Sequence, residues 1–184
     1  MQRMSNILKL LFIFAIILYL PVSVFCQDDE NDYFTIVINT GDKPECINCK
    51  SLYDPKLDNF LKIDASGSSD LVIKIMNNAT DECARSVFIS GGSVYYINHI
   101  PEGIYYLKIA YGYDWSKKVV GSFCFAKFTR DVHYQVGNDL LDFYIKEYSD
   151  GYQIPNYALE LKVISNNKNN EFNADNISEE EFYR

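Results

Sequence analysis

The residue pattern with the clearest chemical meaning is Cys46-Ile-Asn-Cys49, two thiols separated by two residues. This spacing occurs in thiol–disulfide redox motifs, in zinc sites and in structural disulfides. A redox motif would follow a strand and open a helix, whereas Pro44 and Pro55 flank this pair and are typical of a loop. The pattern therefore favours structural disulfides, with redox chemistry at Cys46 and Cys49 as the alternative.

The other cysteines decide how the disulfides pair. Cys83 and Cys124 stand singly in the sequence, so they do not complete a zinc site with the first pair. Four cysteines allow three pairings. We expect Cys46–Cys49 together with Cys83–Cys124, because the second pair lies in two strand-like segments, and the other two pairings stay open.

An aromatic cluster gives the best candidate for ligand binding. Tyr111, Tyr113 and Trp115 alternate around a carboxylate, Asp114, after a predicted strand. Exposed aromatic rings beside a carboxylate are typical of sugar-binding surfaces, where a ring stacks on the sugar and the acid accepts from its hydroxyls. The favoured interpretation is that Trp115 folds back to cap the core. The alternative is a carbohydrate-binding loop over residues 111–115.

The remaining residues offer little further chemistry. The two histidines, His99 and His133, lie in different segments, and no nucleophile elbow, zinc-protease, phosphate-binding or dinucleotide-binding motif occurs. We expect no catalytic residues, no bound metal and no cofactor. The net charge of −8 argues against nucleic acid as a partner, since phosphates need a basic face.

The N-terminus has the pattern of an export signal. Arg3 and Lys9 precede an apolar run over residues 10–20, which is too short to span a bilayer, and Pro21 ends it. We expect a signal peptide over residues 1–26, cut after Cys26, and an acidic tether over 27–32. Removal of Arg3 and Lys9 takes the net charge from −8 to −10. An uncleaved anchor is one alternative, and lipid attachment at Cys26, which the preceding Phe25 disfavours, is the other. All three place the rest of the chain outside the cytosol.

The rest of the chain alternates apolar and polar residues with a period of two, which predicts half-buried strands. Glycine, proline and asparagine turns separate these runs at intervals of about ten residues. The strong segments are 34–39, 71–75, 83–89, 105–109, 141–145 and 159–163, and the weaker ones are 60–63, 93–98, 119–128 and 132–136. This predicts an all-β antiparallel sandwich, immunoglobulin-like or prealbumin-like, over residues 33–165.

Residues 166–184 are polar, acidic and rich in asparagine, which predicts a flexible tail. Ser178 and Glu181 have the spacing of a capping box. Because only three residues follow Glu181, we expect at most one frayed helical turn there.

The stretch from Val94 to Ile109 carries a family resemblance. Its matching residues are Ile97, Ile100, Pro101, Gly103, Tyr105, Leu107 and Ile109. The segment resembles the strand–turn–strand signature of carboxypeptidase-regulatory-like and transthyretin-like β-sandwich modules. The resemblance implies an accessory, binding or structural unit attached to extracytoplasmic proteins, and its motif contains no catalytic residues. Pro101 fits the turn and Gly103 permits a positive φ angle.

These patterns together predict a secreted or surface-exposed β-sandwich that is not an enzyme and has a binding or structural role. The expected partner is a protein or a glycan outside the cell. Contact with a membrane is expected only if the N-terminal segment is retained as an anchor. A redox protein using Cys46 and Cys49 and a carbohydrate-binding module using residues 111–115 remain the alternatives.

Overall fold

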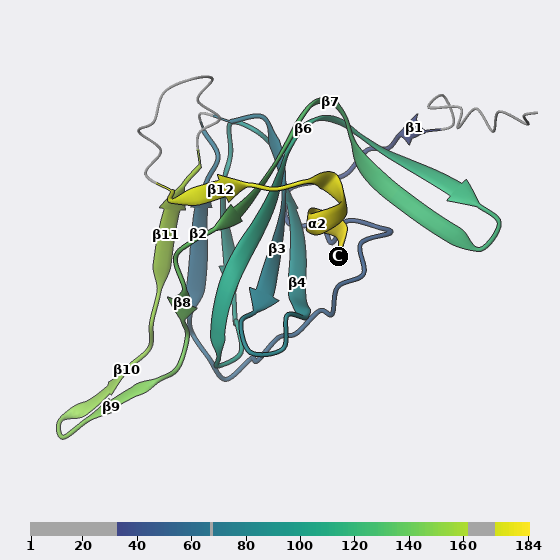
Figure 1. The fold of residues 1–184 in the computed structure, drawn as a ribbon. Coiled ribbons are helices and arrows are strands. Elements are labelled where there is room, and N and C mark those ends of the chain that lie inside the picture. The colour runs from purple at the N-terminus through teal and green to yellow at the C-terminus, as the bar shows by residue number, and fades with distance from the viewer. Residues whose placement is uncertain (1–32, 67, 162–171) are drawn as a thin grey trace, which may run out of the picture. The chain divides into compact units, whose positions relative to one another are not determined.

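The computed structural model describes residues 33–66, 68–161 and 172–184. The predicted signal peptide (1–26), the acidic tether (27–32) and residues 166–171 of the predicted tail lie outside this described part. Within it the chain is mostly β-structure, with largely antiparallel strand pairing and the sheets in a sandwich-like arrangement (Figure 1). The predicted all-β fold class is confirmed at this level.

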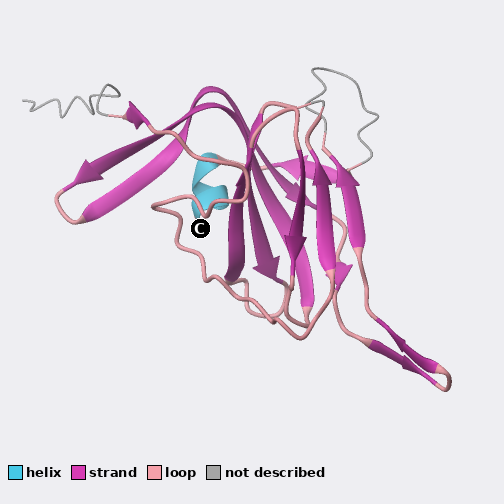
Figure 2. Cartoon of the chain, turned by 180° about the vertical axis from the view of Figure 1, so that it is seen from behind, coloured by secondary structure: helices cyan, strands magenta, loops and turns pink. Residues whose placement is uncertain are grey.

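The larger sheet is antiparallel throughout and has the order β12–β7–β6–β3–β4, with β1 and β8 also pairing with β6. Its strands are β1 (Phe34–Thr35), β3 (Asp70–Asn77), β4 (Cys83–Ile89), β6 (Ile104–Val120), β7 (Phe123–Gly137), β8 (Leu141–Asp142) and β12 (Ala174–Asn176). Two of these strands, β6 and β7, are far longer than the alternation predicts. They form one continuous hairpin whose far half extends away from the two sheets (Figures 1 and 2).

The smaller sheet has the order β11–β2–β5. Its strands are β2 (Phe60–Asp64), β5 (Val94–Asn98) and β11 (Tyr157–Glu160). The pairing of β2 with β5 is antiparallel, but β11 runs parallel to β2. The sheet is therefore mixed. Before the chain enters β11, it forms a separate antiparallel hairpin of β9 (Lys146–Tyr148) and β10 (Gly151–Gln153).

The main core lies between these two sheets and is largely aliphatic. Alternate residues of β3, Leu71, Ile73 and Ile75, are almost completely buried in it. Tyr105 begins the inward row of β6, as the Pro101–Gly103 turn predicts, and its hydroxyl donates to the Pro101 carbonyl over 3.1 Å. Gly103 has a φ of 156°, in agreement with its predicted role.

The opposite face of the larger sheet is covered as well. A second cluster lies there, built from aromatic side chains, sulfur and the N-terminal segment that follows β1. Its members include Val72, Met76, Phe88, Ala110, Trp115, Phe128 and Phe182. The middle strands are therefore buried on both faces, which explains the near-continuous burial of β3.

The C-terminal segment differs from the flexible tail that the sequence predicts. Residues 172–184 contain β12, which pairs with β7, and the short helix α2 (Glu179–Tyr183). The N-cap role of Ser178 is confirmed, since its hydroxyl accepts from the Glu181 backbone N–H over 3.1 Å. Phe182 is fully buried in the second cluster, and this burial stabilises a turn that its length alone would leave frayed.

Candidate functional site

The far half of the β6–β7 hairpin carries several exposed apolar side chains. Val120 pairs with Phe123 across a two-residue turn, Gly121-Ser122, in which Gly121 has a φ of 60°. A positive φ at the first turn residue suits the right-handed twist of a tight hairpin and favours glycine. The turn thus places apolar residues of both strands at one tip.

Four large apolar side chains around this tip face solvent. Val119 is 56% exposed, Val120 50%, Phe123 67% and Phe125 49%. Isolated exposed apolar residues are ordinary, but a contiguous group at a projecting tip is typical of an interaction site. The apolar tip, defined by these four residues, is therefore the candidate binding surface.

Lysines surround the apolar tip. Between residues 115 and 129 the sequence has three lysines, Lys117, Lys118 and Lys127, and no aspartate or glutamate, although the whole chain is acidic. The Lys118 and Lys127 ammonium groups lie 5.9 and 5.1 Å from the centre of the Tyr33 ring. The hairpin is thus a cationic and apolar element on an anionic protein.

The acidic partners of these lysines come from outside the hairpin. Lys117 contacts Glu45 over 2.6 Å and Lys127 contacts Glu179 over 3.4 Å, and both carboxylates are at least half exposed. Exposed ion pairs of this kind are worth about 0–1 kcal/mol. Another anion can therefore replace either carboxylate at small cost.

A disulfide braces the hairpin. Cys124, next to the tip, bonds to Cys46, and their Cα atoms are 5.1 Å apart. The bond closes a separation of 78 residues and ties the far half of β7 to the segment that follows β1. On chain entropy alone, such a closure contributes about 4 kcal/mol.

The second disulfide joins Cys49 to Cys83, with Cα atoms 4.8 Å apart. All four predicted cysteines are therefore bonded, but the preferred pairing of Cys46 with Cys49 and Cys83 with Cys124 is wrong. Cys83 begins the edge strand β4, and β3 and β6 separate it from Cys124 in β7. Two disulfides indicate an oxidising, extracytoplasmic environment.

The predicted aromatic loop over residues 111–115 is not a loop, since all five residues lie inside β6. Trp115 is 2% exposed and packs edge-on against Phe128 with ring centres 4.9 Å apart, and Tyr111 is 3% exposed. Neither offers a face to a sugar ring. The structure supports the favoured interpretation, in which Trp115 packs on the core.

The other two predicted ligand residues lie at a bend in the hairpin. Asp114 has a φ of 59° beside a register shift between β6 and β7, and its carboxylate accepts from the Arg130 Nε over 2.8 Å. The Arg130 guanidinium in turn lies 4.5 Å from the centre of the Tyr113 ring. These residues pair with each other, and β-bulges of this kind bend and twist a strand pair.

Gly112 stands at the same bend and is required there by close packing. A Cβ atom at this position would lie 2.6 Å from the Phe128 Cβ. The bend thus brings the backbone of β6 onto the aromatic pair that fills the root of the hairpin, and from there the hairpin departs from the sheet.

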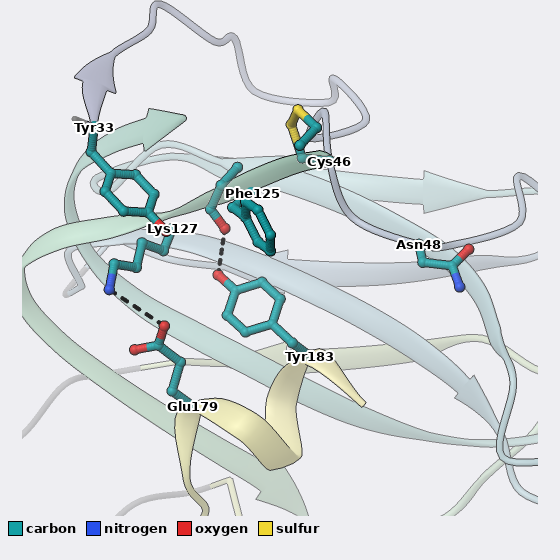
Figure 3. A pocket seen from close by; sticks show the side chains of 9 residues that line it. Tyr33, Cys46, Asn48, Phe125, Lys127, Glu179 and Tyr183 are labelled. Atoms are coloured by element: carbon teal, nitrogen blue, oxygen red, sulfur yellow. Dashed lines mark hydrogen bonds and ion pairs between the residues drawn. A yellow bond between two sulfur atoms is a disulfide. The ribbon is translucent and has the colours of Figure 1, made fainter. Parts of the chain in front are cut away.

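A small cavity of about 200 Å³ lies beside residues 124–127 of β7, where α2 and the segment around Cys46 contact the hairpin (Figure 3). It is lined by Tyr33, Cys46, Asn48, Cys124, Phe125, Ala126, Lys127, Glu179 and Tyr183. Pockets for small organic ligands are usually about 300–1,000 Å³. This cavity is smaller, and we assign it to the contact between α2 and the hairpin.

Helix α2 supports the hairpin from one side. The Tyr183 hydroxyl donates to the Ala126 carbonyl over 2.7 Å, and Glu179 contacts Lys127 (Figure 3). Burial raises the pKa of Tyr183 above its usual value, with Tyr134 and Glu179 adding to the effect. The hydroxyl therefore stays neutral and keeps donating well above neutral pH.

Two buried lysines hold α2 on the sheet. Lys74 and Lys108 face each other in the register of β3 and β6, and they are only 2% and 4% exposed. The Lys74 ammonium donates to the Phe182 carbonyl and that of Lys108 to the Glu181 carbonyl, both over 2.8 Å. Burial, with the nearby charge of Lys108, lowers the pKa of Lys74 to about 8.

A larger open groove of about 500 Å³ lies beside β4 and β5 and contains several aromatic side chains. Arg85 occupies its middle and donates to the carbonyls of Leu52 and Asn98. His99, in the same groove, contacts the Leu57 carbonyl through Nδ1 over 2.6 Å. Both side chains hold neighbouring loops together, so we assign the groove a structural role rather than a ligand-binding one.

Within residues 33–66, 68–161 and 172–184, no three His, Cys, Asp or Glu side chains gather as a metal site would require. None of the helices in these described ranges is both long enough and apolar enough to span a bilayer.

Comparisons with family models, with curated proteins and with solved structures return no match. The resemblance to carboxypeptidase-regulatory-like modules stays a prediction, and the case for a function depends on the apolar tip and the elements that brace it.

Proposed function

We propose that this protein is a secreted, non-catalytic binding module and that the far half of the β6–β7 hairpin is its binding surface. The observation that carries the proposal is the apolar tip, where four large side chains remain about half exposed or more. Solvent exposure of this much apolar surface opposes solubility. A partner that covers the tip would account for its presence.

The bracing of the hairpin supports a binding role. A two-stranded hairpin is marginally stable by itself. Here Cys46–Cys124, the pairing of β1 with β6, and the contact between Tyr183 and Ala126 all hold it in place. A rigid element loses little conformational entropy when it binds, which favours affinity.

The cysteine pairing bears on the redox alternative. A catalytic Cys-x-x-Cys pair would cycle between two thiols and one bond joining Cys46 to Cys49. Each of these cysteines instead bonds to a distant partner, Cys124 or Cys83. This arrangement favours structural disulfides and, with them, a binding module over a redox enzyme.

Photocrosslinking tests the proposed surface. The chain is produced with p-benzoylphenylalanine in place of Phe123, and a matched control carries it in place of Tyr152, which is 71% exposed at the tip of the β9–β10 hairpin. Both are irradiated with the envelope and extracellular fractions of the producing cell. We expect an adduct, to protein or to lipid, at position 123 and none at position 152.

Competition makes this test specific. An excess of unlabelled wild-type chain should abolish the adduct, while an excess of the Phe123→Ser/Phe125→Ser variant should leave it. Equal adducts at both positions, or equal competition by the wild type and the variant, would overturn the proposal.

A further inference from the structure

The geometry points to an anionic lipid surface as the partner of the apolar tip, an inference that rests on the proposed function. The sequence predicts contact with a membrane only through the N-terminal segment. The hairpin supplies a second and independent means of contact, because it combines exposed apolar side chains with lysines and carries no acid between residues 115 and 129.

The order of residues along the hairpin fits the depth profile of a membrane surface. Val120 and Phe123 form the last rung, and the rungs behind it pair Lys118 with Phe125 and Ser116 with Lys127. At about 3.3 Å per residue, the lysine backbones lie about 7–13 Å behind the tip. Interfacial apolar groups enter lipid by about 5–10 Å, so the ammonium groups would reach the headgroup phosphates.

The lysines occupy both faces of the hairpin. Strand alternation places Lys117 with Val119 on one face and Lys118 and Lys127 with Phe125 on the other. Insertion of the tip would thus surround it with cations on both sides. The exposed carboxylates of Glu45 and Glu179 hold two of them only weakly and can give way to lipid phosphate.

Shape favours a fluid partner. The tip is the end of a hairpin that extends away from the sheets (Figure 2). A protein partner would need a groove matching this projection, whereas lipid headgroups part around it. The negative charge of the whole chain repels an anionic membrane, so the cationic hairpin would also set the orientation of approach.

Vesicle co-sedimentation tests the inference with the chain in the form that its producing cell releases. The probes are vesicles of phosphatidylcholine alone and vesicles with one quarter phosphatidylglycerol. The variants are Phe123→Ser/Phe125→Ser and Lys117→Gln/Lys118→Gln/Lys127→Gln, and the matched control is Tyr148→Ser/Tyr152→Ser. All share one N-terminus, so any binding through that segment cancels between them.

We expect the wild type to bind the anionic vesicles, with an affinity that falls about fivefold for each lysine removed. Added salt should weaken this binding. The double Phe variant should lose at least about tenfold. The Tyr control should bind as the wild type does, and neutral vesicles should bind weakly. Circular dichroism and intact disulfides would show that each variant is folded.

Equal sedimentation of the wild type and both hairpin variants would overturn the lipid inference. The crosslinking experiment then separates the two proposals. A tip-dependent adduct to a protein, without tip-dependent vesicle binding, would leave the binding surface standing and replace lipid by a protein partner. Failure of both experiments would remove the proposed function as well.

Discussion

In the described part of the chain, the β6–β7 and β9–β10 hairpins both extend from the sheets, and they differ in almost every property that matters for binding. Between residues 115 and 129, the β6–β7 hairpin carries four exposed apolar residues and three lysines, and a disulfide ties it to the segment that follows β1. The β9–β10 hairpin exposes Tyr148 and Tyr152 among Lys146, Glu147 and Asp150, a mixed-charge composition, and contains no cysteine. Both are visible in Figure 1.

The difference shows what distinguishes a surface loop from a binding element. Tyrosine with charges of both signs is compatible with water, so β9–β10 needs no partner to explain it. Valine and phenylalanine at the end of a braced hairpin expose apolar area that is costly in water. The bracing matters as much as the exposure, because it holds that area in one fixed place.

The largest expected effect comes from the root of β6–β7. Trp115→Ala removes a side chain that is 2% exposed and packs against Phe128, and large-to-small changes of this kind cost about 3–5 kcal/mol of unfolding free energy. Chemical denaturation measures the loss, with Tyr113→Ala, at a 38% exposed position, as the control. A loss below about 1 kcal/mol would show that the root of the hairpin is not part of the core.

The next effect concerns the brace. Cys46→Ser/Cys124→Ser should cost about 4 kcal/mol and also raise hydrogen exchange over residues 113–130. The matched variant Cys49→Ser/Cys83→Ser should cost a similar amount and leave exchange in the hairpin unchanged. The same exchange pattern in both variants would mean that the first disulfide does not act on the hairpin in particular.

A smaller effect tests the support from α2. Because the pKa of Lys74 is lowered to about 8 in the folded chain, the unfolded chain binds more protons above that pH, and stability should rise from about pH 8 to about pH 9.5. Lys74→Met should flatten this rise. Folding raises the pKa of some tyrosines, such as Tyr111 and Tyr183, so above about pH 10 the unfolded chain loses their protons first and stability should fall as the pH rises.

Equal pH profiles for the wild type and Lys74→Met would show that the ammonium is not buried against α2. Lys62→Met is a suitable control because Lys62 lies in β2 of the smaller sheet, away from α2, and its change should leave the slope intact.

The smallest effect belongs to the other hairpin. Tyr148→Ser/Tyr152→Ser should change the free energy of unfolding by less than about 0.5 kcal/mol, since both side chains are mostly exposed. A large loss in thermal or chemical denaturation would mean that β9–β10 is itself a structural element, and the contrast between the hairpins would disappear.

Alternation in the sequence is enough to predict β3, β4 and the first part of β6, because their inward residues are buried in one core, whereas the predicted segments 34–39 and 141–145 contain strands of only two residues, β1 and β8. Residues 83–89 coincide with β4, and the expected turn at Pro101–Gly103 is present. The parallel pairing of β11 with β2 could not be predicted, because period-two patterns do not encode strand direction. Order in residues 172–184 could not be predicted from composition, because Phe182 is buried against residues of distant strands.

The candidate site was harder to predict than the fold. The sequence predicts one weak strand over residues 119–128, whereas in the structure the turn Gly121-Ser122 divides this segment between the two strands of a hairpin. A glycine followed by serine between two apolar pairs is a hairpin signal that could have indicated the turn. Lys74, by contrast, stands at a polar position in the alternation of β3, where the pattern predicts a solvent-facing side chain. It is buried because α2 covers that face of the larger sheet.

The most direct test of the account is the fluorescence of a tryptophan placed at the tip. Phe123→Trp adds a reporter to a chain whose single native tryptophan, Trp115, is buried, and Tyr152→Trp gives the matched control. Addition of vesicles containing phosphatidylglycerol should shift the emission of the first variant to the blue, and brominated lipid chains should quench it, while the second variant should change little. Unchanged emission from Phe123→Trp, or equal shifts in both variants, would contradict the assignment of the β6–β7 tip as a lipid-binding surface.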